Sequence, residues 1–201
     1  MHNDEVTSQD VHHWREASGL YGLQMFGESL ESLNRISPHN EFHPDVMQLR
    51  SQVCLGLKNY GEAFFCAKKL AEARPDEPMG PILLAEALRH NGEDGLRRAR
   101  NILLGAYHRF GSDSLTIPYN ISAYSAALGD RRMARKFLLR TFIQAAGTEW
   151  EGYYENFTLT DADFAGFNLI PRLAEQARRI TARLKRRASG GKSKNEERVF
   201  L

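Results

Sequence analysis

Two aspartates stand close together in the stretch LTDADF, at Asp161 and Asp163, where paired carboxylates could perform acid–base chemistry or hold a metal ion. General acid–base catalysis needs two carboxyl groups in a shared cleft with separated pKa values, and a spacing of two residues does not establish such a cleft. Both residues also suit the first turn of a short helix, where side-chain oxygens cap backbone N–H groups and negative charge is favoured. We therefore predict that Thr160 or Asp161 caps a short helix.

Histidines occur in two groups. His12 and His13 can share one helical face with Glu16, and His39 and His43 flank a proline-bounded loop. Zinc needs three or four converging ligands, and the signature H-E-x-x-H is absent from the chain. The sequence therefore predicts surface histidines and no metal site.

The remaining reactive groups also favour structural roles. Cys54 and Cys66 are twelve residues apart without a C-x-x-C pattern, so we expect two small core residues. The string GGKS at 190–193 resembles part of a phosphate-binding loop, but Arg186 stands where that motif needs its first glycine. We therefore predict no catalytic residue, no cofactor and no enzymatic activity.

The chain has 201 residues, of which 42% are hydrophobic and 26% charged, values typical of globular proteins. This composition excludes collagen-like, disordered and disulfide-scaffold classes, and no apolar stretch approaches the roughly 18 residues of a membrane span. The first ten residues lack a basic segment followed by an apolar run, so we predict no secretory signal. Two cysteines without export predict reduced thiols in the cytoplasm.

Charge is unevenly distributed along the chain, although the formal net charge is only +2. Residues 172–201 carry ten Lys or Arg and three Asp or Glu, whereas residues 1–171 carry 17 basic and 22 acidic residues. A basic end of this kind is either a solvated helix end or a segment that seeks anions. Both interpretations stay open.

A small residue that follows a turn and opens a new helical pattern recurs along the chain. Its four occurrences are spaced by 34, 36 and 35 residues: Ser29, Ala63, Ala99 and Ala134. Each has an apolar partner four residues later, at Leu33, Ala67, Leu103 and Leu138. Another helical stripe precedes each turn, and prolines and glycines separate the units. This periodicity is typical of amphipathic helices, and no alternating pattern indicates strands.

These units resemble the tetratricopeptide repeat (TPR), a family of 34-residue helix–turn–helix units. The second unit matches best, with Tyr60, Ala63, Ala67, Leu70 and Pro75 at its packing and terminal positions. The third unit keeps Ala85, Leu88, Gly92, Ala99 and Ala106, and the fourth keeps Gly129, Ala134 and Leu138. The first unit is degenerate, with Ala17, Leu20, Phe26, Ser29 and Leu33. The resemblance covers residues 12–145. Arg50, Ser51 and Ser125 depart from its pattern.

The resemblance implies an all-α fold, an α-solenoid of about four helical hairpins. We expect repeats at 12–43, 44–78, 79–114 and 115–146, followed by a C-terminal cap at 147–187. Short bacterial members of this class often end in a similar aspartate-x-aspartate-phenylalanine segment before a last helix. Residues 1–187 are thus expected to form one repeat domain with nine to eleven helices. Residues 188–201 have loop composition and are predicted to form a flexible basic tail.

In the TPR family, the first helix of each unit lines a concave groove that holds a peptide or a helix of a partner protein. Carrying that geometry over predicts one continuous surface on this chain: Trp14, Tyr21, Gln48, Gln52, Ile82, Glu86, Arg89, Tyr119, Asn120 and Ala123. Rings provide contact area, and amides satisfy a peptide backbone. Trp14 and Tyr119 could instead pack between hairpins.

The sequence therefore predicts a non-enzymatic module or scaffold for protein–protein interaction. The partner is expected to be a protein or peptide. The alternative is a binder of nucleic acid or of an acidic surface that uses the basic C-terminal helix and tail. No aromatic residue interleaves with the arginines at 178–187 to stack on bases, which argues against the alternative.

Overall fold

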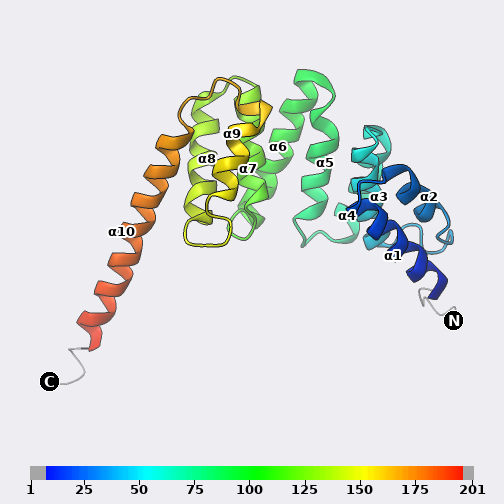
Figure 1. Ribbon diagram of the computed structural model, residues 1–201, viewed down its shortest axis with the longest axis horizontal. Helices are drawn as coiled ribbons and strands as arrows, with labels where there is room; N and C mark the ends of the chain where they lie inside the picture. Colours follow the sequence, from blue (N-terminus) through cyan, green and yellow to red (C-terminus); the bar gives the residue numbers. More distant parts are fainter. Residues whose placement is uncertain (1–7, 197–201) are drawn as a thin grey trace. The chain divides into compact units, whose positions relative to one another are not determined.

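A computed structural model describes the backbone of residues 8–196 and the side chains of residues 8–187 (Figure 1). Within that range the chain is all-α, with ten α-helices, one short 3-10 helix and no strand. By contact the chain divides into two compact units, Met1–Phe110 and Gly111–Leu201. The fold class predicted from the helical periodicity is therefore confirmed as all-α.

The N-terminal unit contains six helices that pack against their neighbours in chain order. They are α1 (Ser8–Gly22), α2 (Phe26–Asn34), α3 (Pro44–Gly56), α4 (Tyr60–Ala73), α5 (Met79–Arg89) and α6 (Gly92–Phe110). In addition, α3 contacts both α1 and α5, so the odd-numbered helices are neighbours.

The C-terminal unit is built on the pair α7 (Thr116–Ala127) and α8 (Arg131–Ala145). A short helix α9 (Tyr153–Thr160) follows, and then the 3-10 helix η1 (Ala162–Phe164) and the long α10 (Ile170–Glu196). Helix α10 packs on α8 and α9, while η1 packs on α7.

The four helix pairs each bury small residues on both of their helices. Each recurring small residue of the second helices is fully buried, and the preceding helix also buries a small residue. These residues are Ala17 and Ser29, Ser51 and Ala63, Ala85 and Ala99, and Ser122 and Ala134. In three pairs the serine hydroxyl donates to the carbonyl of its facing residue, over 2.8–2.9 Å. Small side chains on both helices allow this close approach.

The turns within the pairs repeat the same backbone conformation. Seven residues after each small residue of the first helix, one residue has a φ between +59° and +76°. These residues are Gln24, Lys58, Gly92 and Gly129. A left-handed residue ends a helix and redirects the chain, and glycine adopts it with the least strain. Asn59 and Asp130 then cap the next helix by accepting from the N–H of Glu62 and Met133.

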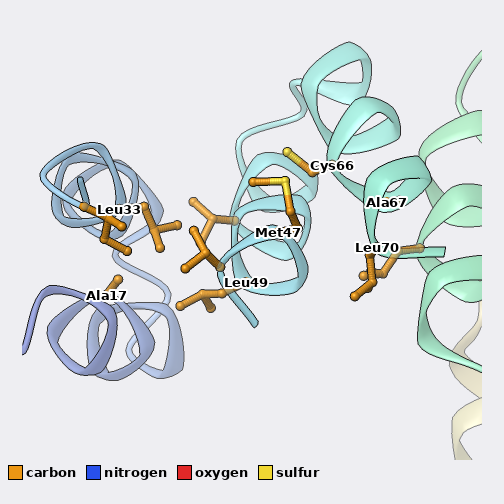
Figure 2. Close-up of a cluster of buried hydrophobic side chains, with 11 residues drawn as sticks. Ala17, Leu33, Met47, Leu49, Cys66, Ala67 and Leu70 are labelled. Atoms are coloured by element: carbon orange, nitrogen blue, oxygen red, sulfur yellow. The ribbon is translucent and has the colours of Figure 1, made fainter. Parts of the chain in front are cut away.

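Apolar side chains from α1, α2, α3 and α4 form the core of the N-terminal unit, and Leu83 of α5 joins it. Figure 2 shows how they meet, with Leu33 from α2, Met47 and Leu49 from α3, and Leu70 from α4. Helices α4 and α5 approach closely at Gly80, where a Cβ would lie 2.7 Å from Ala71 Cα. That position therefore requires glycine.

Helix α10 has two differently packed parts. Ile170, Leu173 and Ala177 recur at helical spacing and are buried, but Leu184, at the same spacing, is exposed. All six side chains at 182–187 are exposed, so the packed part of the helix ends before residue 182.

The prediction of a tail without regular structure from residue 188 also differs from the structure, because α10 continues to Glu196. Extending a formed helix adds one hydrogen bond per residue without a new nucleation cost, which outweighs the helix-weakening glycines at 190 and 191. Residues 197–201 of the predicted tail lie outside the described residues.

No helix in the described part of the chain is both long enough and apolar enough to cross a membrane.

Candidate partner-binding site

An open cavity of about 200 Å³ lies in the N-terminal unit, where α1 meets the loop before α3. Its apolar wall is formed by Val11 and Trp14 of α1, Ile36 of the loop and Val46 of α3. Its polar lining residues are Asp10, Asn40, His43 and Asp45. Pockets for drug-sized ligands measure about 300–1,000 Å³, whereas a cavity of about 150 Å³ holds a benzene ring. This cavity therefore suits one large apolar side chain.

Asp10 fixes the loop that closes one side of the cavity. Its carboxylate is buried and accepts hydrogen bonds from Ser37 N at 2.9 Å, Ser37 Oγ at 2.7 Å and Asn40 Nδ2 at 2.8 Å. A buried carboxylate is tolerated when hydrogen bonds of this kind replace its hydration. Asp10 thus holds the wall of the cavity in place.

Trp14 is half-buried and connects α1 to the start of α3. Its indole Nε1 donates to the carbonyl oxygen of Asp45 at 3.3 Å, and its ring packs against the apolar core. The Asp45 carboxylate forms an ion pair with Arg74 at 2.7 Å. Both carboxylates at the cavity are therefore engaged by other residues of the chain.

The other predicted surface residues of the N-terminal unit are all half-buried. Gln48 and Gln52 lie one turn apart on α3, and no hydrogen bond joins either amide to another described residue. On α5, Glu86 lies 3.9 Å from Arg89 and 3.6 Å from His90. These side chains give α3 and α5 a partly accessible polar face.

Two apolar members of the predicted surface also lie in the N-terminal unit. Ile82 shares the face of α5 with Glu86, because the two residues are one turn apart. Tyr21 on α1 contacts the ring of Phe26 at 5.8 Å between centroids. Both side chains keep part of their surface exposed.

In the C-terminal unit the prediction of an exposed ring is wrong. Tyr119 is only 3% exposed, and Ala123 on the same face of α7 is 1% exposed. The segment containing α9 and η1 covers Tyr119, whose ring contacts Tyr154, Phe157 and Phe164 at 5.2–5.9 Å between centroids. Asn120, the remaining predicted residue, is half-buried.

Asp161 acts as a capping residue, as predicted. Its Oδ1 accepts from the backbone N–H of Asp163 at 2.9 Å at the start of η1. Its Oδ2 accepts a hydrogen bond from the Tyr119 hydroxyl at 2.6 Å. Burial, together with this carboxylate, raises the pKa of Tyr119. The aspartate therefore links the covering segment to α7.

The two cysteines are free, fully buried core residues, as predicted. Burial, assisted by the charge of Glu62, raises the pKa of Cys54 to about 11 and that of Cys66 to about 12. Thiols with such pKa values are protonated at neutral pH and are poor nucleophiles.

His13 departs from the prediction of surface histidines. It is only 8% exposed, and its Nδ1 lies 3.9 Å from Glu16 Oε2. His12, next to it, is exposed. Within the described part of the chain, no three His, Cys, Asp or Glu side chains are placed to hold a metal ion.

Sequence reasoning missed Asp10 and His43 at the cavity. Asp10 precedes the periodic pattern of the first unit, so the spacing of hydrophobic residues could not predict that it is buried. His43 caps α3 by accepting from the N–H of Asp45 at 3.3 Å, and Pro44 after it was the available signal for a helix start. Comparisons of the chain with protein-family models, with curated proteins and with solved structures found no match.

Proposed function

We propose that this protein is a TPR-like α-solenoid whose N-terminal unit binds a segment of a partner protein. The recurring small residues, the four equivalent turns and the packing of successive helices support the repeat assignment. A single helical pair cannot bury both of its apolar faces, so stacking of repeats is the physical outcome of such a pattern. Binding without catalysis is the role that this architecture favours.

The observation that carries the proposal is the open cavity beside Trp14. An apolar wall of Val11, Ile36 and Val46 next to a half-buried tryptophan is a suitable anchor site for one partner side chain. Anchors of this kind supply much of the binding energy in protein interfaces, because they are desolvated within well-packed pockets. A leucine, phenylalanine or tryptophan of the partner fits its volume.

The polar face of α3 complements such an anchor. The amides of Gln48 and Gln52 each offer a donor and an acceptor, which is what the backbone of an extended peptide needs. Glu86 and Arg89 on α5, which packs against α3, add charges of both signs. We therefore propose an extended or helical segment with one large apolar residue as the partner.

Two observations support a role without chemistry. Both carboxylates at the cavity are held by other residues, and both thiols have pKa values far above neutrality. General acid–base or nucleophilic catalysis needs groups poised near neutral pH. We propose the cytoplasm as the location, since the two free thiols suit a reducing compartment.

Peptide selection tests the proposal. The full chain is used to select from a displayed library of random twelve-residue peptides, and a recovered peptide is synthesised and titrated by calorimetry. We expect the recovered peptides to share one large apolar residue. Trp14→Ala, which removes one wall of the cavity, should weaken binding at least tenfold, the loss of about 1.4 kcal/mol.

A matched control uses the other tryptophan, Trp150, which is 44% exposed in the C-terminal unit. Trp150→Ala should leave binding within about twofold. Val11→Phe fills the cavity while keeping its wall apolar, so it separates loss of the site from loss of folding. Failure to recover any peptide, or equal binding by the Val11→Phe variant, would contradict the proposal.

The exposed end of α10 supports a second candidate function, binding of a nucleic acid. The side chains at 182–187 are all exposed and include four basic residues: Arg183, Lys185, Arg186 and Arg187. Phosphate contacts of this kind make affinity fall steeply with salt. The full chain and an Arg183→Glu, Arg187→Glu variant are titrated against a labelled single-stranded oligonucleotide. Binding that ignores salt or this charge reversal would contradict the candidate.

A further inference from the structure

A second, shallower cavity of about 270 Å³ lies in the C-terminal unit, between the loop after α8 and one face of α10. Arg178, Thr181 and Lys185 line it from α10, where they recur at helical spacing. Gly147 and Glu151 line it from the loop. The cavity is separate from the proposed partner site, which lies in the other unit.

Thr181 has an unmet hydrogen-bonding requirement in this cavity. Its Oγ1 is buried and has no hydrogen-bond partner among the described residues. A buried hydroxyl without a partner is disfavoured, so such an atom indicates a missing partner. The cavity that Thr181 lines is the place from which that partner can come.

Gly147 brings backbone and cation together. Its φ is +80°, in the region that favours glycine, and a Cβ there would lie 2.7 Å from Lys185 Nζ. The positive φ favours glycine at this position, and the lysine ammonium lies close to the backbone there. The Gly147 N–H is a second donor at the cavity, beside Lys185 Nζ.

Glu151 places a carboxylate in the same cavity. Its Oε2 accepts from Gly147 N at 2.6 Å, and its side chain is exposed to solvent at the rim. The loop is thus already arranged to hold an oxyanion, with the chain's own carboxylate in that place. An exposed glutamate can rotate away at low cost when a stronger anion competes.

Arg178 supplies fixed positive charge beside the cavity. Its guanidinium is oriented by Glu155 at 3.0 Å and by Glu175 at 3.4 Å. Because these carboxylates use part of its hydrogen-bonding capacity, its contribution to a ligand is mainly electrostatic.

We propose that this cavity binds a phosphate group, either as inorganic phosphate or as the phosphate of a small monoester. Its oxygens would accept from Lys185 Nζ, Thr181 Oγ1 and Gly147 N, and Glu151 would move aside. Three donors from two elements match a tetrahedral anion better than a planar carboxylate. The phosphate also gives the Thr181 hydroxyl its missing partner.

Fluorescence of Trp150, which lies one residue before Glu151, reports occupancy in a Trp14→Phe background. The full chain is titrated with inorganic phosphate, with phosphoserine and with acetate, at constant ionic strength. We expect saturable binding of phosphate, with acetate at least tenfold weaker. Comparable binding of phosphoserine identifies a monoester site, whereas binding of inorganic phosphate alone identifies a site for the free ion.

Variants distinguish the cavity from the general basic charge of α10. Lys185→Met should weaken phosphate binding about tenfold and Thr181→Val several-fold, because each removes one donor. Glu151→Gln should strengthen binding several-fold by removing the competing charge, an effect that misfolding cannot produce. Arg183→Met, on the same helix but outside the cavity, should change affinity less than twofold.

Absence of saturation, equal affinity for acetate, or equal losses in the Lys185→Met and Arg183→Met variants would overturn the proposal. None of these outcomes tests the proposed partner site, which lies in the other unit.

Discussion

The first helices of the helix pairs differ between the two units in how far their faces are covered. In the N-terminal unit, Trp14, Gln48 and Gln52 remain half-buried, and an open cavity lies beside the tryptophan. In the C-terminal unit, Tyr119 on α7 is buried beneath α9 and η1 of the same chain. An aromatic ring on such a face is thus partly accessible in one unit and covered by the chain itself in the other.

The covered face also indicates what kind of segment fits on a first helix. The segment over α7 contributes Tyr154, Phe157 and Phe164 as apolar contacts, and Asp161 accepts the Tyr119 hydroxyl. Apolar rings thus provide contact area, while one polar group satisfies the buried hydroxyl. The partner proposed for the N-terminal unit uses the same division of roles.

Truncation of Tyr119 and of Trp14 should give the largest difference in stability between the two units. Tyr119→Ala removes a buried ring and leaves a cavity, so we expect a loss of about 3–5 kcal/mol in the free energy of unfolding. Trp14→Ala should cost less, about 1–2 kcal/mol, because its side chain is only half-buried. Urea denaturation of both variants measures the difference, and equal losses would break the comparison.

Enlarging the small residues at the helix crossings should affect both units alike. Ala63→Leu and Ala134→Leu each force a larger side chain into a fully packed crossing, so each should cost about 1–3 kcal/mol. Thermal unfolding of the two variants tests this expectation. An unchanged melting temperature for one of them would show that its helix pair packs differently from the other.

Alkaline pH should act first on the N-terminal unit, which contains both buried thiols. The pKa of Cys54 is raised from 9.0 to about 11, so the folded state keeps its proton where the unfolded state loses it. The free energy of unfolding is therefore highest below pH 9 and falls as the pH rises toward 11. At pH 10 the loss is about 1.4 kcal/mol per thiol, one pH unit above the unfolded pKa.

Each unit contains one tryptophan, so fluorescence of Trp14 and Trp150 in single-tryptophan variants follows this effect separately. The signal of Trp14 should respond at lower pH than that of Trp150. A Cys54→Ala, Cys66→Ala variant removes the two thiols and serves as the control. Its stability should change less between pH 8 and pH 10 than that of the parent, and an identical change would refute the assignment.

The turns should give the smallest effects. Lys58 adopts a left-handed conformation without being glycine, so Lys58→Gly should raise the free energy of unfolding by about 0.5–1 kcal/mol. Gly129→Ala, at the equivalent position in the C-terminal unit, should lower it by about 1 kcal/mol. Denaturation curves that shift in the same direction for both variants would show that the two turns are not equivalent.

The helix pairs were predictable from sequence because their signal is local and periodic. The burial of Ser29, Ala63, Ala99 and Ala134 follows from a small residue recurring at the spacing of one helical pair. Only two of these four left-handed turns could be predicted from the sequence, because glycine occupies positions 92 and 129. Gln24 and Lys58 give no such signal.

The candidate sites were less predictable, because they depend on contacts between distant segments. The spacing of Trp150, Tyr153 and Phe157 does not indicate that this segment folds back over Tyr119. The hydrogen bond that fixes it joins Tyr119 to Asp161, which lies 42 residues later in the chain. The cavity depends similarly on Asp10 holding a loop 27 to 30 residues away. A hydrophobic period reports which face of a helix is buried and not which segment buries it.

The serine bonds in three of the four helix pairs make two positions of each of these pairs interchangeable. The hydroxyl comes from the second helix at Ser29 but from the first helix at Ser51 and Ser122, and in each case it reaches the carbonyl of the facing residue. Loss of the hydroxyl on one helix can thus be compensated by its gain on the other. Such a pair is constrained jointly rather than site by site, so we expect substitutions at 51 and 63 to covary.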